Sequence, residues 1–274
     1  MFKRLTDQQR DTIEQADSFS PNMLKIKALF QAYGTQYDFV RFYANDSKNA
    51  IVSIQDNCAT LYCKDDSDLE EACEFISMLS NEVLSEQPLR LAGYQEEIGN
   101  IYVCHRFEDV TLDPLSHEIQ DAYQVLSQVF SNDINDKNYP RWYTEISHRV
   151  RHGVSKVYTY QNLCSATAYC NIDGQLFITQ LATVEHARGQ GLAKKLLYHI
   201  ATHEKNVNRI VLLSQNKVSD QFYQNIGFTF LKHWYFYNRE ENKQYLSNCV
   251  YPYKLPQSRT ARHAPNRKML SIYL

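Results

Sequence analysis

The sequence lacks the features that mark several large classes of protein. Its 29 lysines and arginines are outnumbered by 31 aspartates and glutamates, which gives a formal net charge of −2. Because nucleic-acid binding normally leaves a basic footprint, this balance argues against nucleic acid as the main partner. No apolar run approaches the length of a membrane span, and the opening residues, MFKRLTDQQR, hold no apolar signal-peptide core. We therefore expect a cytoplasmic protein without nucleic-acid or membrane partners.

Cysteine occurs in an odd number and without the spacing of a metal site. No CxxC pair is present, and no histidines are paired at ligand spacing. A disulfide framework and a structural zinc site are therefore not expected, and a reducing compartment is the simple interpretation. The seven cysteines are Cys58, Cys63, Cys73, Cys104, Cys164, Cys170 and Cys249.

The segment from Gln180 to Ala193 is the most informative, although it lacks the glycine spacing of the common nucleotide motifs. An apolar run over 177–184 leads to Gly189 and Gly191, which open an amphipathic helix. Neither the P-loop pattern nor the third small residue of the dinucleotide fingerprint is present. A helix start nearly bare of side chains still presents free N–H groups and a positive dipole end. The segment therefore predicts a phosphate or pyrophosphate site.

A second motif follows the glycine turn at a fixed distance. The spacing that fits the turn is Arg/Gln-x-x-Gly-x-Gly/Ala, and a short buried strand is predicted at 209–213. The two motifs supply, in order, Arg188, Gly191, Ala193, Asn216, Tyr223, Gly227 and Phe228. With these residues the chain resembles the GNAT superfamily of acetyl-CoA-dependent N-acetyltransferases. The resemblance covers roughly residues 100–239 and is most specific over 177–228.

The resemblance implies an α/β (α+β) fold, in which a mixed, mostly antiparallel sheet is flanked by helices on both faces. We predict a GNAT domain over 99–257 and a basic tail over 258–274. Residues 1–98 are predicted to form a smaller α/β unit, similar to the degenerate half-GNAT unit of glycine-N-acyltransferase-like relatives. This unit has no glycine turn and no Tyr-x-x-x-Gly-Phe motif, so we expect it to bind no coenzyme.

The resemblance also assigns the coenzyme-binding residues. Backbone groups of Leu181, Ala182 and Thr183 would hold the pantetheine, and an amide there would stabilise the oxyanion. Backbone amides of Arg188, Gly189, Gln190, Gly191, Leu192 and Ala193 would hold the pyrophosphate. Asn216 either lies near the pantetheine or caps the following helix, and Ser219 is a further coenzyme contact and a candidate cap. We expect Val218, Phe222 and Ile226 to form the apolar stripe of this helix, with Tyr223 rotated off it.

Acetyl transfer requires a proton for the departing thiolate and a base for the amine. The phenol of Tyr223, with a reference pKa of about 10, is a suitable proton donor, although a half-buried packing role is the alternative. The strand over 177–184 carries no carboxylate that could serve as the base, and Glu185 lies just beyond it. Glu145 and His148 are candidates on a preceding helix. A solvated helix face, or a water chain to a backbone carbonyl, would explain the pattern equally well.

The sequence therefore predicts an acetyl-CoA-dependent acetyltransferase without a metal, acting on the amine of a small molecule or peptide by direct attack in a ternary complex. A coenzyme-A-binding sensor or scaffold without turnover is the competing interpretation, and transfer of longer acyl groups is a third. The sequence does not identify the acceptor. The oligomeric state is open, with a homodimer as one option.

Overall fold

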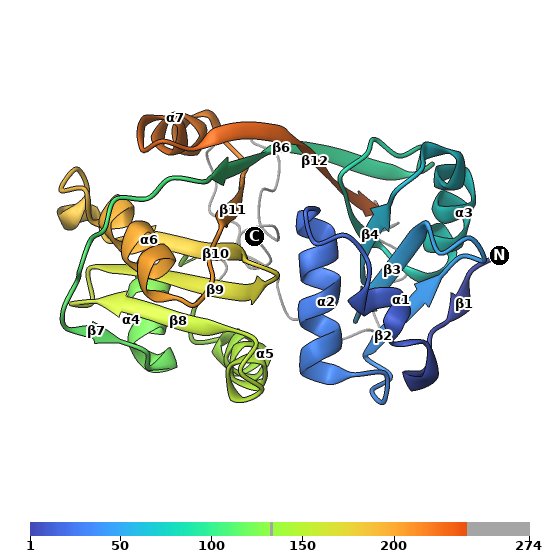
Figure 1. Ribbon diagram of the computed structural model, residues 1–274, viewed down its shortest axis with the longest axis horizontal. Helices are drawn as coiled ribbons and strands as arrows, with labels where there is room; N and C mark the ends of the chain where they lie inside the picture. The colour runs from blue at the N-terminus through green and yellow to red at the C-terminus, as the bar shows by residue number, and fades with distance from the viewer. Residues whose placement is uncertain (132–133, 240–274) are drawn as a thin grey trace, which may run out of the picture.

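The computed structural model describes residues 1–131 and 134–239, so the predicted basic tail at 258–274 lies outside the described residues. Within them, twelve strands form one mixed sheet in the order β1-β2-β3-β4-β5-β12-β6-β11-β10-β9-β8-β7. Helices lie against this sheet, and the molecule divides into an N-terminal and a C-terminal half (Figure 1). The predicted fold class, a mostly antiparallel sheet flanked by helices, is confirmed.

The N-terminal half is a small α/β unit, as predicted, with a helix, three strands, a second helix and a further strand in order. Its main elements are α2 (Pro21–Tyr33), β2 (Val40–Ala44), β3 (Ala50–Gln55), β4 (Cys58–Cys63), α3 (Leu69–Leu79) and β5 (Glu82–Ser85). The short elements β1 (Lys3–Arg4) and α1 (Asp11–Glu14) precede them. The Ser20 hydroxyl accepts a hydrogen bond of 3.1 Å from the Met23 amide, so Ser20 is the N-cap that its position before proline predicts. Gly34, with φ of 62°, ends the helix.

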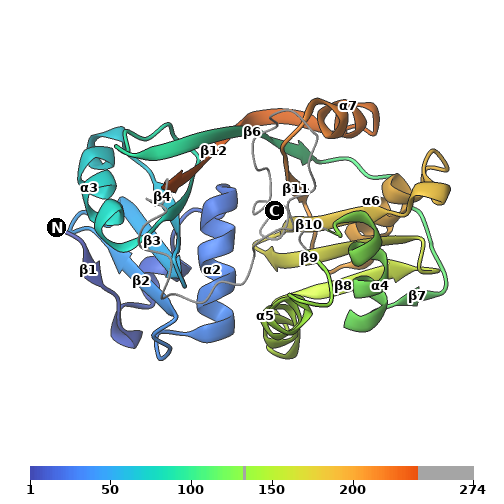
Figure 2. The same ribbon diagram turned by 180° about the vertical axis from the view of Figure 1, so that it is seen from behind.

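Helix α2 stands between the two halves, as Figures 1 and 2 both show. Twelve of its thirteen residues are buried, which explains why its sequence has no clear polar face. Leu24 and Ala28 pack in one core with Tyr169, Val211 and Trp234 of the C-terminal half. The apolar residues of one helix therefore serve the cores of both halves.

The C-terminal half contains the elements that the resemblance implies. They are β6 (Tyr94–Cys104), β7 (Leu115–Ser116), α4 (Ile119–Val129), α5 (Tyr139–Arg151), β8 (Lys156–Tyr160), β9 (Cys164–Ile172), β10 (Gln175–Thr183), α6 (Leu192–His203), β11 (Arg209–Ser214), α7 (Lys217–Asn225) and β12 (Thr229–Arg239). Asp173 and Gly174, with φ of 52° and 75°, form the predicted hairpin turn between β9 and β10. Leu115 pairs with Tyr160 in β7, and α4 begins four residues later.

Two long strands run across both halves. Strand β12 pairs with β6 along its length and with β5 of the N-terminal half at its far end, where Phe236 lies opposite Leu84. The domain boundary predicted between residues 98 and 99 falls inside β6. Alternate residues of β6 enter different cores: Tyr102 and Cys104 pack beneath α6, whereas Ile101 and Val103 pack on the side of α2.

Candidate active site

The candidate site begins where two parallel strands separate. Strands β10 and β11 pair in parallel through only three positions, and the last of these is Phe177 opposite Val211. Beyond it, β10 continues to Thr183 and β11 to Ser214 without further pairing between them. The edge of β10 over 178–183 therefore faces an opening in the sheet. An extended chain with amide groups, such as a pantetheine arm, can pair with such an edge.

A bulge in β10 bends the strand at this opening. Its antiparallel register with β9 shifts between Thr179 and Ala182, and Gln180 has φ of 54°, in the left-handed region. A non-glycine residue in this conformation costs of the order of 1–3 kcal/mol, a strain typical of ligand sites. The Gln180 side chain is held in place by a hydrogen bond of 3.1 Å from the Thr167 hydroxyl. Beyond the bulge, Ala182 and Thr183 pair again with Ser165 and Cys164 of β9, on the side away from the opening.

The glycine turn follows β10 and leads into α6. Gly189 and Gly191 have φ of 78° and 74°, and a Cβ placed on either would meet no atom within 4 Å. Open space therefore lies in front of the turn. Gly191 is the N-cap of α6 and supplies no side chain to the amides of Leu192 and Ala193. The amide N–H groups of Leu192 and Ala193 are therefore available to a ligand in the open space before the glycine turn.

The charges around the start of α6 also suit an anion. The first turn of the helix contains no acidic residue, although acidic residues are favoured at that position. The exposed Lys195 stands there instead, together with Lys194, whose Nζ is paired with Glu108 at 3.0 Å. The side chains of Arg188 and Gln190 brace the turn, since they donate hydrogen bonds to the carbonyls of Thr183 and His186 at 3.2 and 3.4 Å. The residues present thus fit the pyrophosphate group that the sequence predicts.

Tyr223 lies on the side of α7 that faces the sheet. Its ring centroid is 5.9 Å from that of Tyr102 on β6 and 5.7 Å from that of Phe228. Burial, and then the charge of Asp220, raise the pKa of its phenol above the ordinary value. No residue within 1–131 and 134–239 forms a hydrogen bond with its hydroxyl. A protonated phenol without a partner is the state that a proton donor requires.

The structure corrects two details of α7. Asn216, not Ser219, is the N-cap: its Oδ1 accepts hydrogen bonds from the Ser219 amide at 2.9 Å and the Ser219 hydroxyl at 3.2 Å. Val218 does not belong to a buried stripe, because it is 80% exposed. Tyr223 and Ile226 instead pack against the core beneath α6. The side of α7 that packs against the core therefore includes Tyr223 and not Val218. Gly227, with φ of 93°, follows the helix end as predicted.

Glu145 and His148 are not brought together with Tyr223. Glu145 accepts a hydrogen bond of 3.0 Å from Arg141, which also pairs with Asp56. His148 stacks on Tyr33 of α2 at 4.2 Å and bonds to the Ala32 carbonyl. Their helix, α5, lies at the opposite side of the C-terminal half from α7 in both views (Figures 1 and 2). Their contacts thus join α5 to the N-terminal half, which is a packing role.

Sequence reasoning missed a polar chain beside Tyr223. The Asn100 side-chain amide donates a hydrogen bond of 2.9 Å to Asp220 Oδ2, and His233 Nδ1 lies 2.9 Å from Asn100 Oδ1. Asp220 precedes Tyr223 by three positions, so helical spacing alone could have placed it on the same side of α7. Asn100 and His233 lie on β6 and β12, and only the register of those strands makes them neighbours.

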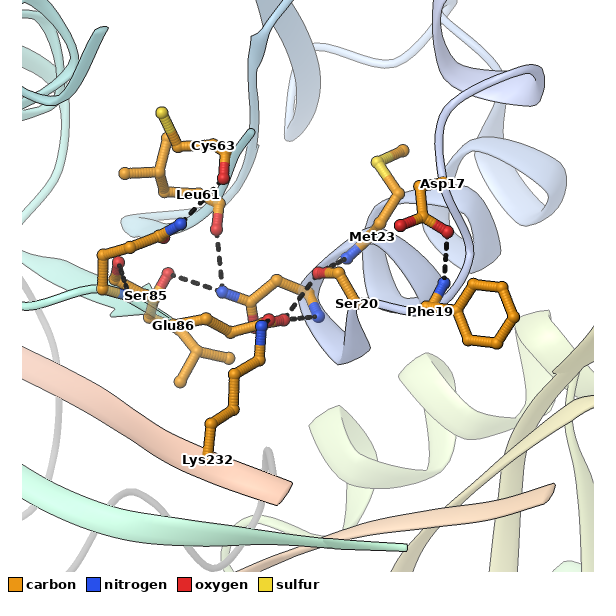
Figure 3. Close-up of polar contacts among 12 residues, drawn as sticks. Asp17, Phe19, Ser20, Met23, Leu61, Cys63, Ser85, Glu86 and Lys232 are labelled. Atoms are coloured by element: carbon orange, nitrogen blue, oxygen red, sulfur yellow. Dashed lines mark hydrogen bonds and ion pairs between the residues drawn. The ribbon is translucent and has the colours of Figure 1, made fainter. Parts of the chain in front are cut away.

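The N-terminal half contains a comparable strand–helix–strand arrangement, but it is closed. Strands β4 and β5 are parallel and pair as far as Thr60 opposite Leu84. Where they would separate, the Asn22 side-chain amide donates to the carbonyls of Leu61 and Leu84 at 2.8 and 3.4 Å. Gln87 similarly reaches the Cys63 carbonyl at 2.7 Å (Figure 3). These side chains occupy the edge groups that a pantetheine arm would need, which supports the prediction that this half binds no coenzyme.

Glu86 completes the closure at the start of α2. Its Oε1 accepts hydrogen bonds from the Ser20 hydroxyl at 2.6 Å and the Asn22 amide at 2.7 Å, and its side chain is 4% exposed. Lys232 on β12 forms an ion pair with its other oxygen (Figure 3). The anion at this helix start is therefore a side chain of the protein itself.

The described residues contain no cluster of His, Cys, Asp and Glu able to hold a metal ion. Among the same residues, no helix combines the length and apolar character needed to cross a membrane. The six cysteines that the structure describes are all free thiols, and Cys249 lies outside the described residues.

Comparison with known proteins identifies the fold and a similarity of one segment to a known domain. Residues 155–230 match the family model of the acetyltransferase (GNAT) domain. No curated protein sequence matches the chain. An acetyltransferase of the GNAT family from Colwellia psychrerythraea is 14% identical, with a TM-score of 0.52 over 88% of this chain and 100% of that one.

Two further structures share the two-halved arrangement over most of their length. A Drosophila protein is 12% identical, with a TM-score of 0.57 over 86% of this chain and 98% of its own. A tandem GNAT protein from the clavulanic acid biosynthesis pathway is 9% identical, with a TM-score of 0.51 over 86% and 97%. The matched segment, residues 155–230, spans the strand opening, the glycine turn and Tyr223 and is similar to a GNAT acetyltransferase domain, and the solved structures share the fold.

Proposed function

We propose that the protein transfers the acetyl group of acetyl-CoA to the amine of a small molecule or peptide, by direct attack in a ternary complex. The observation that carries this proposal is that three features lie where strands β10 and β11 end. The β10–β11 opening accepts an extended amide chain, the start of α6 accepts a pyrophosphate, and Tyr223 offers an unpaired protonated phenol. Such an arrangement would hold the coenzyme at two points and leave its thioester next to a proton donor.

Each group has a defined task in this reaction. Backbone groups of Leu181 to Thr183 pair with the pantetheine, and an amide there stabilises the negative charge that develops on the thioester oxygen. The amides at the start of α6 and the exposed Lys195 beside them hold the pyrophosphate. The amine nitrogen forms a bond to the carbonyl carbon as the carbon–sulfur bond breaks. Tyr223 then gives its proton to the departing thiolate.

Coenzyme binding is tested by reversing a charge at the pyrophosphate site. Lys195→Glu places a carboxylate in the first turn of α6, where it favours the helix dipole but repels the pyrophosphate. We expect the melting temperature of the free protein to be unchanged or slightly higher, and acetyl-CoA to bind about tenfold more weakly at low ionic strength. Lys205→Glu is the matched control, because it makes the same charge change just beyond the other end of α6.

Isothermal titration calorimetry and thermal unfolding measure this effect directly. With the parent protein we expect one acetyl-CoA per chain, because the N-terminal half is closed by Asn22 and Gln87. At about 100 times the dissociation constant, the coenzyme should add roughly 2.7 kcal/mol, or about 5–10 °C in melting temperature. No shift at saturating coenzyme would contradict the assignment of the site, and two bound molecules would contradict the closure.

Turnover is tested separately with a panel of amines. Release of free thiol from acetyl-CoA should rise when small amines and peptides with free N-termini are added, and mass spectrometry should find the acetylated product. A parallel series with benzoyl-CoA compares acetyl with longer acyl transfer. Binding of acetyl-CoA without product from any amine would instead favour a coenzyme sensor or scaffold.

A further inference from the structure

The general base that the β10 strand lacks has a structural candidate on β12. Three side chains form a hydrogen-bonded chain from the surface to α7: His233, Asn100 and Asp220. His233 is exposed, whereas Asp220 is half-buried and its Oδ1 is buried without a hydrogen-bond partner in the described part of the chain. This series of hydrogen bonds therefore joins a titratable surface group, His233, to the carboxylate of Asp220 on α7, the helix that carries Tyr223.

The direction of each hydrogen bond follows from chemistry. An ionised carboxylate only accepts, so Asn100 must turn its NH₂ toward Asp220 and its carbonyl oxygen toward His233. That oxygen also only accepts, so His233 Nδ1 must carry the proton of the neutral ring. The lone pair is then on Nε2, which makes no hydrogen bond within the described residues. These hydrogen bonds thus fix the tautomer in which Nε2 is the accepting nitrogen.

The position of this base relative to the strand opening follows from strand register. His233 lies opposite Asn100, and Asn100 lies opposite Ser214, the last residue of β11. The three residues form one row across three adjacent strands, with a spacing of about 4.8 Å between neighbours. The row ends beside the opening between β10 and β11. His233 therefore stands about 10 Å from the edge of the opening, which its side chain and one water molecule can span.

Aromatic rings connect the same two points. Phe230 lies 5.1 Å from the ring of His233 and 6.3 Å from that of Tyr102, which in turn lies 5.9 Å from Tyr223. Phe230 is 48% exposed. His233 and Tyr223 are thus linked through Phe230 and Tyr102 by one row of aromatic rings, and the amine and the thioester would meet between the two groups.

We propose that His233 is the general base of acetyl transfer, and that Asn100 and Asp220 are positioning residues that fix its tautomer. This inference rests on the proposed function. As the amine nitrogen bonds to the carbonyl carbon, its proton passes to His233 Nε2, directly or through one water molecule. The carbon–sulfur bond breaks and Tyr223 protonates the sulfur. The exposed His233 then releases its proton to solvent, and Tyr223 regains one, so that the enzyme returns to its starting state.

The other charged and titratable groups around His233 have partners of their own, so His233 is the group best suited to act as the base. Lys232, its neighbour on β12, is directed to Glu86 of the N-terminal half. On α7, Asp220 faces His233 only through Asn100, and it also raises the pKa of the Tyr102 phenol, although burial contributes more to that shift. Tyr102, the remaining titratable group on β6 nearby, accepts a hydrogen bond of 3.2 Å from Gln224.

The test combines a deletion of the base with its chemical rescue. In His233→Ala we expect kcat to fall by about 100-fold, the usual effect of losing a general base. Acetyl-CoA should still raise the melting temperature as in the parent protein. Added imidazole should restore at least a tenth of the parent rate, because it can occupy the space of the missing ring and accept the proton. His105→Ala, at an exposed histidine just beyond β6, is the control and should keep the parent rate.

Variants of the positioning residues separate this role from simple packing. Asp220→Asn should lower kcat by about tenfold without rescue by imidazole, because the ring is still present but its tautomer is no longer fixed. A parent-like kcat in His233→Ala, or a loss that imidazole does not restore while coenzyme binding persists, would overturn the proposal. If the parent protein itself acetylates no amine, the proposed function fails instead, which is a distinct result.

Discussion

Tyr223→Phe is expected to lower kcat by about 100-fold while leaving acetyl-CoA binding almost unchanged. The substitution removes one oxygen that has no hydrogen-bond partner in the described part of the chain, so folding should lose little. The thiolate, however, would have to leave without its proton donor, which costs the rate enhancement typical of general acid catalysis. Steady-state kinetics with thiol detection and the coenzyme-induced rise in melting temperature measure the two effects separately.

The pH dependence of the parent protein provides a second check on Tyr223. Burial and the Asp220 charge both raise its pKa, so the phenol loses its proton only at a higher pH than an ordinary tyrosine. It should therefore remain a donor up to at least about pH 10, and kcat should show no decrease from Tyr223 between pH 7 and 9. Tyr143→Phe, an exposed tyrosine on α5, serves as the control. Equal kcat in Tyr223→Phe and Tyr143→Phe would show that Tyr223 only packs.

Gly99→Ala should have the largest effect on stability, at about 3 kcal/mol or more. A Cβ at this position would lie 2.2 Å from Cζ2 of Trp234 and 2.3 Å from the backbone oxygen of Ser214. Trp234 is 1% exposed, and its indole N–H donates a hydrogen bond of 3.1 Å to that same oxygen. The methyl group would therefore push apart β11, β6 and β12 at the end of the strand opening.

Urea unfolding followed by tryptophan fluorescence measures this loss, because Trp234 leaves its buried site on unfolding. Gly93→Ala is the control: its φ is 79° but no atom lies within 4 Å of an added Cβ. It should cost only about 1–2 kcal/mol, the penalty of a left-handed alanine. Replacing Trp234 as well should not rescue Gly99→Ala fully, since the Ser214 oxygen remains in place. A loss in Gly99→Ala no larger than that in Gly93→Ala would show that the strands can adjust around the methyl group.

The sequence predicted those parts of the molecule that local chemistry decides. The glycine turn before α6 depends on a few adjacent residues, and the structure contains it with Gly191 as the N-cap of the helix. The order of strands and helices in the C-terminal half followed from the resemblance. The short parallel register of β10 and β11 leaves an opening beside the residues assigned to the pantetheine, whose binding stays a prediction.

The remaining parts depend on contacts between distant segments. The stripe predicted on α7 counted Val218 because it is apolar, but the first turn of that helix projects into solvent and the buried side is set by the sheet below. His233 and Asn100 are 133 residues apart, and only the pairing of β12 with β6 makes them neighbours. Glu145 and His148 carry suitable chemistry, but α2 occupies the face of α5 on which His148 lies.

The sheet that passes through both halves has a consequence for the order in which the protein can fold during synthesis. Strand β5 leaves the ribosome about 140 residues before β12, the strand that covers its outer edge. Until then, the N-terminal half carries an open strand edge, on which another chain could pair. The half that is made first is thus completed by the half that is made last, and nascent chains that end before β12 should be prone to aggregate.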